Sequence, residues 1–199
     1  MSIQLSYVPG ATPLDLDEIA GLIPSDISTQ GQLNQAEQQN ILRGELWCFG
    51  KKQNNILNEA FVKRIHKKMF GDVWRWAGSF RKSNKSIGID WHQIPIELHK
   101  LLDDTKYWIE HETYEWIELA TRFHHRMVWI HPFPNGNGRF SRTFTDLLLV
   151  TYQQERFSWG SLTDSGNLED QGPMRERYIA ALKDGDQKKY KKLMGFVVS

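Results

Sequence analysis

Two prolines, Pro132 and Pro134, interrupt a stretch of sequence that otherwise has strong helical periodicity. Proline cannot occupy a helix interior, because it lacks an amide hydrogen and its ring clashes with the preceding turn. The upstream helix must therefore end close to His131. The turn signal after Pro134 and the renewed spacing of apolar residues predict a second helix that begins at Gly136 or Asn137. The sequence thus specifies a sharp corner between two helices, with a histidine at its edge.

Most of the remaining chain also has apolar residues at the spacing of one helix face. The periodic segments cover residues 33 to about 50, 57–70, 94–110, 114–130, 136 to about 153, 174–182 and 187–193. Residues 1–32, in which prolines are frequent, predict an irregular lead-in with at most a short helix near residues 15–22. No linker is long enough to separate two full domains, so we expect a single, mostly helical domain.

The stretch from Ser79 to Trp91 departs from this helical pattern. Residues 83–86 form a turn-rich cluster, and Ile87-Gly88-Ile89 after it favours β structure. We therefore expect a short β-hairpin here. The predicted fold class is all-α, a helical bundle with one small β-hairpin.

Composition narrows the functional classes. Of the 199 residues, 40% are hydrophobic, which excludes a disordered chain, and 25 basic residues balance 24 acidic ones, so no global field attracts nucleic acid or an anionic membrane. A single cysteine, Cys48, forms no intramolecular disulfide and is too few for a cysteine-based zinc site. The N-terminus lacks the pattern of a cleaved signal, and the longest apolar runs are far too short to span a bilayer. We expect a cytoplasmic protein.

The start of the second helix has the features of an anion site. The exposed N–H groups and the dipole of a helix N-terminus attract negative charge, and Gly136 and Gly138 let a phosphate approach the backbone closely. Arg139 and Arg142 lie three residues apart on this helix, so their guanidinium groups leave it in similar directions. Because arginine matches phosphate oxygens in a bidentate manner, the cluster is suited to a nucleotide polyphosphate.

Three residues of the preceding loop complete the prediction. The imidazole of His131, with an ordinary pKa near 6.5, can accept a proton from a hydroxyl that attacks a bound phosphate. Phe133, between the prolines, is expected to point inward and anchor the loop. Asn135 offers an amide oxygen that could weakly hold a magnesium ion carried by the phosphates.

The segment His131-Pro-Phe133-Pro-Asn135-Gly136-Asn137-Gly138-Arg139, with Arg142 three residues later, closely resembles the signature of the Fic family. That signature is a histidine, any residue, phenylalanine, any residue, an acidic residue, Gly-Asn-Gly-Arg, two residues and arginine. Residues 74–78 (Trp-Arg-Trp-Ala-Gly), 123–125 and 180–186 also resemble Fic domains. The resemblance extends from about residue 35 to the C-terminus, so we expect a Fic domain over residues 33–199.

The resemblance implies an all-helical Fic fold and an enzyme that transfers AMP from ATP, with magnesium, to a Ser, Thr or Tyr hydroxyl of a target protein. His131 would be the general base. The nucleotide would be bound by Asn135, Gly136, Asn137 and Gly138, by Arg139 as a phosphate contact and by Arg142 as the γ-phosphate clamp. The hairpin resembles the family's flap, which pairs with the target as an added strand; its docking edge would be Ser86, Ile87, Gly88, Ile89 and Asp90.

One position departs from the signature, because Asn135 replaces the acidic metal ligand. Asparagine at this position resembles the related Doc toxins, which transfer phosphate, yet Doc lacks the second glycine that this chain keeps as Gly138. AMP transfer is the favoured hypothesis. Phosphate transfer, de-AMPylation and a catalytically idle nucleotide-binding module stay open, as do the target protein, an antitoxin partner and self-association.

Many Fic proteins are inhibited by a helical glutamate that pairs with the second arginine of the signature. In the segment 33–49 the matching residue is Glu37, which the resemblance would pair with Arg142. The inhibitory pattern is imperfect here, because Leu33 replaces its hydroxyl residue and Gln38 follows the glutamate. Ser165 and Glu169 have the same spacing, but they lie in a segment expected to be a loop.

Overall fold

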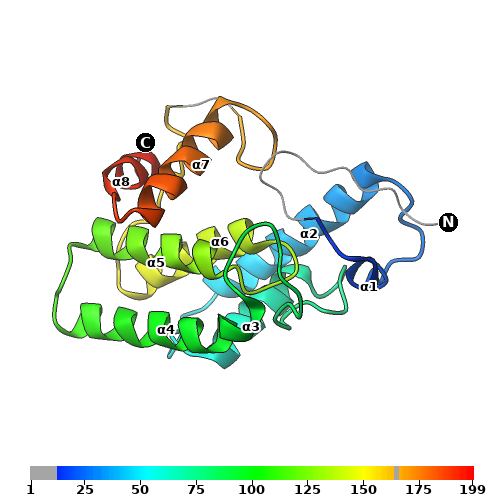
Figure 1. The fold of residues 1–199 in the computed structure, drawn as a ribbon, viewed down its shortest axis with the longest axis horizontal. Helices are drawn as coiled ribbons and strands as arrows, with labels where there is room; N and C mark the ends of the chain where they lie inside the picture. The colour runs from blue at the N-terminus through cyan, green and yellow to red at the C-terminus, as the bar shows by residue number, and fades with distance from the viewer. Residues whose placement is uncertain (1–12, 164–165) are drawn as a thin grey trace.

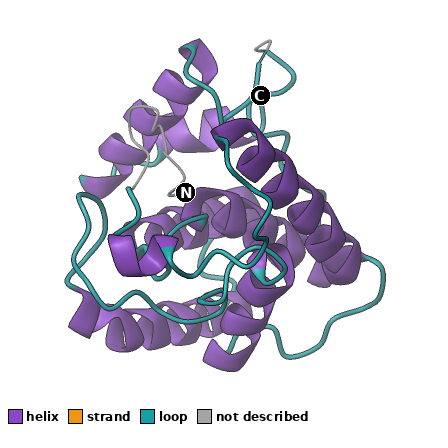
Figure 2. Ribbon diagram, turned by 90° about the vertical axis from the view of Figure 1, so that its right-hand side faces the viewer, coloured by secondary structure: helices purple, strands orange, loops and turns teal. Residues whose placement is uncertain are grey.

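The computed structural model describes residues 13–163 and 166–199, and over these residues the protein is helical (Figure 1). Its elements, in chain order, are α1 (Leu16–Ile19), α2 (Gln30–Phe49), α3 (Glu59–Phe70), the 3-10 turn η1 (Trp91–Gln93), α4 (Ile94–Glu110), α5 (Trp116–Ile130), α6 (Asn137–Thr151), α7 (Pro173–Asp186) and α8 (Lys191–Val197). The described residues form no strand (Figure 2). An isolated antiparallel bridge joins Leu22 and Trp74. The expected all-α class is confirmed. None of the described helices is both long and apolar enough to cross a bilayer.

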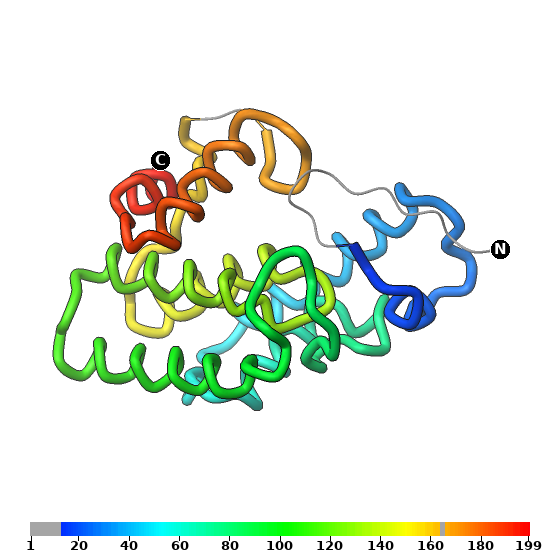
Figure 3. Tube along the Cα trace, viewed as in Figure 1, coloured from blue at the N-terminus to red at the C-terminus, as the bar shows by residue number. Residues whose placement is uncertain are grey.

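The pair α5 and α6 forms the centre of the molecule. Phe123 of α5 meets Phe144 of α6 edge to face, with ring centroids 5.1 Å apart, and both rings are fully buried. Helix α4 packs along α5 on one side, and α7 and α8 pack on the other (Figure 3). Helices α2 and α3 pack on each other and on α6. The corner between α5 and α6 is therefore held between neighbours on both sides.

Helix α2 begins three residues earlier than the periodicity predicts. The hydroxyl of Thr29 accepts a hydrogen bond from the amide of Gln32, and the Gln32 side chain accepts one from the amide of Thr29. This reciprocal capping box satisfies two amides that would otherwise lack partners, so the helix extends back to Gln30. The predicted lead-in, residues 1–32, therefore ends inside a helix, and its first twelve residues lie outside the described part of the chain.

The last helix begins four residues later than expected. Helix α7 continues to Asp186, and Lys188 then adopts a positive φ of 62°, which no right-handed helix accommodates. Helix α8 consequently covers Lys191–Val197 instead of residues 187–193.

The expected β-hairpin is not present, and residues 79–90 form bends joined by irregular backbone. The physical reason is Arg81, whose side chain is buried. Its guanidinium donates to the main-chain carbonyls of Ser83 and Ile89 within the segment and to that of His131 outside it. Carbonyls that a hairpin would use between its strands are thus turned toward one central cation. We call residues 82–90 the flap segment below.

Asp15 and Glu18, at the start of the described chain, lie against the flap segment. Lys85, whose side chain is only 3% exposed, forms ion pairs with Asp15 at 2.7 Å and with Glu18 at 2.6 Å. The amide of Ile23 donates to the carbonyl of Val73, which ties the chain after α1 to the end of α3. Helix α1 therefore fastens the flap segment through two carboxylates.

Candidate active site

The loop between α5 and α6 is anchored by its own side chains. Phe133 is completely buried and stacks on the ring of His66, with centroids 3.7 Å apart. Asn137, the first residue of α6, accepts a hydrogen bond from the Phe133 amide at 2.9 Å and donates one to the Phe133 carbonyl at 2.8 Å. The Asn137 side chain thus fastens the loop, and this residue can offer a ligand only its main chain.

His66, which the sequence analysis did not single out, supports the loop from α3. Its Nδ1 accepts a hydrogen bond from the amide of Gly78 at 3.0 Å, so the ring proton lies on Nε2, which faces the carbonyl of Asn135 at 3.1 Å. Complete burial lowers the pKa of His66 to about 3, which keeps the ring neutral and this tautomer fixed. The only sequence signal is a polar residue beside Ile65 on the buried face of a helix.

The N-terminus of α6 has no side-chain cap. Gly136 caps this helix with a positive φ of 78° and has no side chain to bond the first-turn amides. A Cβ at Gly136 would lie 2.4 Å from the ring of Phe70, whereas one at Gly138 would meet only the Arg142 guanidinium, at 3.7 Å. Gly136 is therefore needed by the fold, and Gly138 leaves space above the helix start. We call the first-turn amides of α6 the cradle.

Each arginine beside the cradle has an acidic partner. Arg139 pairs with Glu37 of α2 at 2.7 Å, and the other oxygen of Glu37 accepts from the indole of Trp74 at 2.6 Å. The expected pairing of Glu37 with Arg142 is therefore wrong. The register of α2 decides this, because Asn40, one turn later, is bonded to the carbonyl of Lys68 and fixes the helix on α3.

Arg142 pairs instead with Glu169, in the segment that precedes α7. The hydroxyl of Tyr178 lies 2.8 Å from Nε2 of the buried His124, and burial raises the pKa of Tyr178 to about 12 although the positive charge of Arg142 acts in the opposite direction. Glu169 has the spacing noted in the sequence analysis, but Ser165 lies outside the described residues. The two arginines therefore face carboxylates from opposite ends of the chain.

His131 ends α5 in a left-handed conformation, with φ 53° and ψ 60°, and is only 8% exposed. Gly88 of the flap segment lies directly on it, since a Cβ at Gly88 would stand 2.5 Å from the Cβ of His131. Burial, with Arg81 nearby, lowers the pKa of His131 to about 4, so the imidazole is neutral near pH 7. The sequence correctly predicts that His131 lies at the end of a helix. The structure shows in addition that Gly88 of the flap segment covers this histidine.

The expected docking edge lies along this cover, but it is not a strand. Ile87 is 36% exposed, and Ser86 and Gly88 are also exposed. The carbonyl of Ile89 accepts from Arg81, and the carboxylate of Asp90 accepts from the amide of His92 at 2.9 Å, which begins η1. Of the expected docking edge, residues 86–88 are exposed, and Gly88 lies against His131.

Asn135 does not fit a resident magnesium ion. Its amide oxygen accepts from the amide of Gly136 and faces the guanidinium of Arg139 at 3.4 Å, so donors and a positive charge already surround it. Among the described residues, no cluster of three or more His, Cys, Asp or Glu side chains could hold a metal ion. A magnesium ion carried by the phosphates of ATP would belong to the substrate.

The chain is similar to known proteins in sequence and in fold. The profile of the Fic/DOC family matches residues 56–149. The chain is 28% identical to the protein adenylyltransferase Fic of Aedes aegypti over 102 residues, which are 49% of this chain and 20% of that protein. The chain thus matches about a fifth of the length of that curated relative.

Two solved structures are similar in fold. The N-terminal Fic domain of a VirB-translocated effector from Bartonella quintana has a TM-score of 0.70 and 18% identity, with 89% of this chain and 91% of that one covered. BepC of Bartonella tribocorum, solved with bound AMPPNP, has a TM-score of 0.69 and 17% identity, with 92% and 98% covered. These likenesses establish the Fic fold.

Proposed function

This chain is a member of the Fic/DOC family, and from that premise we propose that it is a protein adenylyltransferase, which transfers AMP from ATP to a Ser, Thr or Tyr hydroxyl of a target protein. The observation that carries the proposal is the corner between α5 and α6. There, His131 ends α5, and α6 begins without a side-chain cap, with Arg139 and Arg142 beside its first turn. The name of the Aedes aegypti relative and the AMPPNP bound by BepC support nucleotide transfer.

The proposed chemistry follows from the positions of these groups. The phosphates lie on the cradle, where amide N–H groups and guanidinium charges stabilise the negative charge that develops on them. The target hydroxyl oxygen attacks the α-phosphorus and gives its proton to the neutral imidazole of His131. The bond between the α-phosphorus and the oxygen that bridges to the β-phosphorus breaks, and pyrophosphate leaves. The proton then passes from His131 to solvent.

We further propose that the conformation described here is autoinhibited. Arg139 and Arg142 each hold a carboxylate where the proposed substrate would place phosphate oxygens. Glu37 is itself buried, with an indole on one oxygen and a guanidinium on the other, so the pair is well satisfied. Binding of ATP therefore requires that at least one of the two acids withdraws.

Labelled ATP tests the reaction class. The purified chain is incubated with ATP labelled at the α or the γ phosphate, with magnesium and a cell lysate as the source of targets. We expect α label on protein with the wild type and none with His131→Ala. The matched control is His99→Ala, which removes an exposed histidine of α4 and should leave labelling unchanged.

Two other outcomes would replace the proposal. Label from the γ phosphate would assign phosphate transfer, which the asparagine at position 135 leaves open. Nucleotide binding without any transfer, also in variants that lack the inhibitory acids, would assign an idle nucleotide-binding module. Retention of the wild-type product in His131→Ala would refute the assigned base.

A further inference from the structure

A second positively charged hollow lies between α2 and α3, away from the cradle. Its volume is about 370 Å³, and its lining includes Arg43 and Trp47 of α2 and Arg64, Lys67 and Lys68 of α3. Phe70 packs its ring under Gly136, whereas the next residue, Gly71, lines this hollow. The end of α3 therefore separates the two places. We call this hollow the α2–α3 pocket.

The charge of the α2–α3 pocket is unbalanced. Arg64, Lys67 and Lys68 are spaced three and four residues apart, so they share one face of α3. None of the three forms an ion pair with a carboxylate in the described part of the chain, and all are exposed. The only acidic residue of the lining, Asp72, is already bound by Arg43 at 2.7 Å. Four cations against one anion are unusual in a chain whose formal net charge is +1.

The walls of the pocket are fixed before any ligand arrives. Asn40 of α2 donates to the carbonyl of Lys68 at 3.0 Å and accepts from the amide of Asp72 at 2.8 Å, which ties the two helices together at the pocket. The indole of Trp47 packs on Phe61, with centroids 6.0 Å apart, and Lys68 lies 5.7 Å from that indole. A preorganised site binds more tightly, because less conformational entropy is lost on binding.

We propose that the α2–α3 pocket is a second anion site, which binds a phosphate-bearing small molecule independently of the cradle. Phosphate oxygens accept hydrogen bonds from guanidinium and ammonium groups, and Arg64 can meet them in a bidentate manner. The half-buried indole of Trp47 provides an apolar wall for an attached organic group. The volume suits a ligand of pyrophosphate or nucleotide size and is small for a folded partner.

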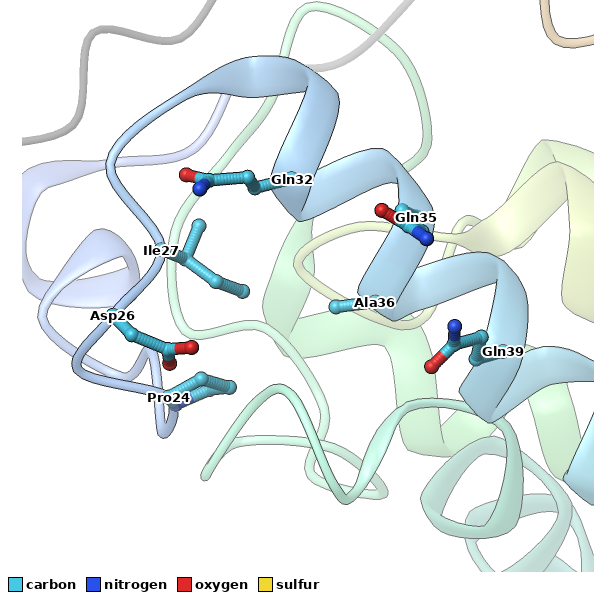
Figure 4. Close-up of a pocket in the computed structure, with 7 residues that line it drawn as sticks. All are labelled: Pro24, Asp26, Ile27, Gln32, Gln35, Ala36 and Gln39. Atoms are coloured by element: carbon cyan, nitrogen blue, oxygen red, sulfur yellow. The ribbon is translucent and has the colours of Figure 1, made fainter.

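Another hollow, of similar size but without basic residues, serves as a comparison for the α2–α3 pocket. It is lined by Gln32, Gln35 and Gln39 of α2 and by residues of the segment before that helix, and it measures about 310 Å³ (Figure 4). Its only charged lining residue is Asp26, so it offers nothing to neutralise an anion. The α2–α3 pocket is therefore distinguished by its charge and not by its size.

Isothermal titration of the full chain with inorganic pyrophosphate, in 150 mM salt, tests the proposal. We expect the Arg64→Gln/Lys67→Gln variant to weaken one binding event by at least about tenfold, because two charged hydrogen-bond donors are lost. Lys100→Gln/Lys106→Gln removes the same charge from α4 and should change nothing. Thermal unfolding of both variants checks that they fold. Equal loss in both variants, or no loss in the first, overturns the proposal.

Two further arms identify the ligand and separate this site from the cradle. Arg142→Gln should weaken binding at the cradle but leave the event that depends on Arg64 and Lys67. In that background, tighter binding of ADP than of pyrophosphate assigns a nucleotide, and equal binding assigns a free phosphate compound. If a hexaglutamate peptide binds the pocket and pyrophosphate does not, the pocket takes an acidic protein segment and the proposal is wrong.

Discussion

At the scale of single residues, two glycines of the same short motif meet different physical demands. Gly136 has a positive φ and rests on the ring of Phe70, so a side chain there is both strained and obstructed. Gly138 lies inside the first turn of α6, where the nearest atom to an added Cβ is 3.7 Å away. The first glycine shapes the corner, and the second leaves room for what the corner binds.

This difference predicts opposite effects of the same substitution. Gly136→Ala should lower the free energy of unfolding by about 2 kcal/mol or more, because it adds backbone strain and a contact of 2.4 Å. Gly138→Ala should raise it by about 0.5 to 1 kcal/mol, since alanine loses less entropy in a helix. Urea unfolding of both variants measures the two changes.

Nucleotide binding should separate the same two variants. On the proposed function, the methyl group of Gly138→Ala obstructs the approach of phosphate to the cradle, so affinity for ATP falls although the protein is more stable. Gly138→Ala with unchanged ATP affinity would contradict the position assigned to the phosphates. Equal destabilisation by both substitutions would contradict the packing of Gly136 on Phe70.

At the scale of elements, sequence periodicity predicts where helices lie better than how they are joined. The end of α5 and the start of α6 are predicted well because two prolines and a turn signal lie between them. The start of α2 is missed because it depends on the reciprocal bonds of Thr29 and Gln32. The predicted hairpin is wrong because the buried Arg81 overrides the local β propensity. Arg81 binds carbonyls of its own segment and also the carbonyl of His131, 50 residues away, and sequence pattern does not reveal this distant partner.

The same limit applies to the partners of the two arginines. Their presence beside the cradle follows from the motif, but the acid that each one meets depends on how α2 and the segment before α7 pack. Glu37 is one turn from Asn40, whose bonds to α3 set the register, and Glu169 is 27 residues from Arg142. The resemblance to the family assigns Glu37 to Arg142, which is wrong, and Glu169 is set aside because its segment is expected to be a loop.

Removal of these acids should expose the cradle. Glu37→Gln keeps an oxygen for the indole of Trp74 but loses the negative charge that pairs with Arg139. Glu169→Gln removes the negative charge that pairs with Arg142. We expect each to raise affinity for ATP roughly three- to tenfold, and the double variant more, because a competing charged pair is lost. Titration with a non-hydrolysable ATP analogue measures this.

A glutamate elsewhere on α2 provides the control. Glu45 accepts from Thr143 at 3.1 Å and pairs with neither arginine, so Glu45→Gln should leave the affinity unchanged. If Glu37→Gln and Glu169→Gln resemble this control in ATP affinity and in labelling, the two acids do not inhibit. If only one of them differs from it, that acid alone is the inhibitor.

At the scale of the whole molecule, several histidines are buried in neutral form. Burial lowers the pKa of His66 and of His124 to about 3 and that of His131 to about 4, and it also lowers the pKa of His125. His66 lies on α3, His124 and His125 lie on α5, and His131 ends α5. In the unfolded chain each returns to a pKa near 6.5. Between about pH 4 and 6.5, these rings therefore bind protons in the unfolded state but not in the folded state.

This shared burial predicts a steep loss of stability in mild acid. Well above pH 6.5 both states hold these rings neutral, and the rings contribute almost no pH dependence. As the pH falls below 6.5 the unfolded state binds about three more protons than the folded state, so stability decreases until the pH reaches the folded pKa values near 3 to 4. Between pH 6 and 5 we expect a loss of about 3 to 4 kcal/mol, a large part of the stability of an ordinary domain.

Urea unfolding at pH 7, 6 and 5 measures this slope, and variants show which rings cause it. His66→Gln preserves an amide that can donate to the carbonyl of Asn135, and it should reduce the slope by about one proton even if it lowers stability at pH 7. His99→Gln removes an exposed ring of α4 and should leave the slope unchanged. A slope that is flat from pH 7 to 5 would mean that the rings become protonated without unfolding. Water would then reach the corner between α5 and α6 in the folded protein, and His131 would titrate near its ordinary pKa.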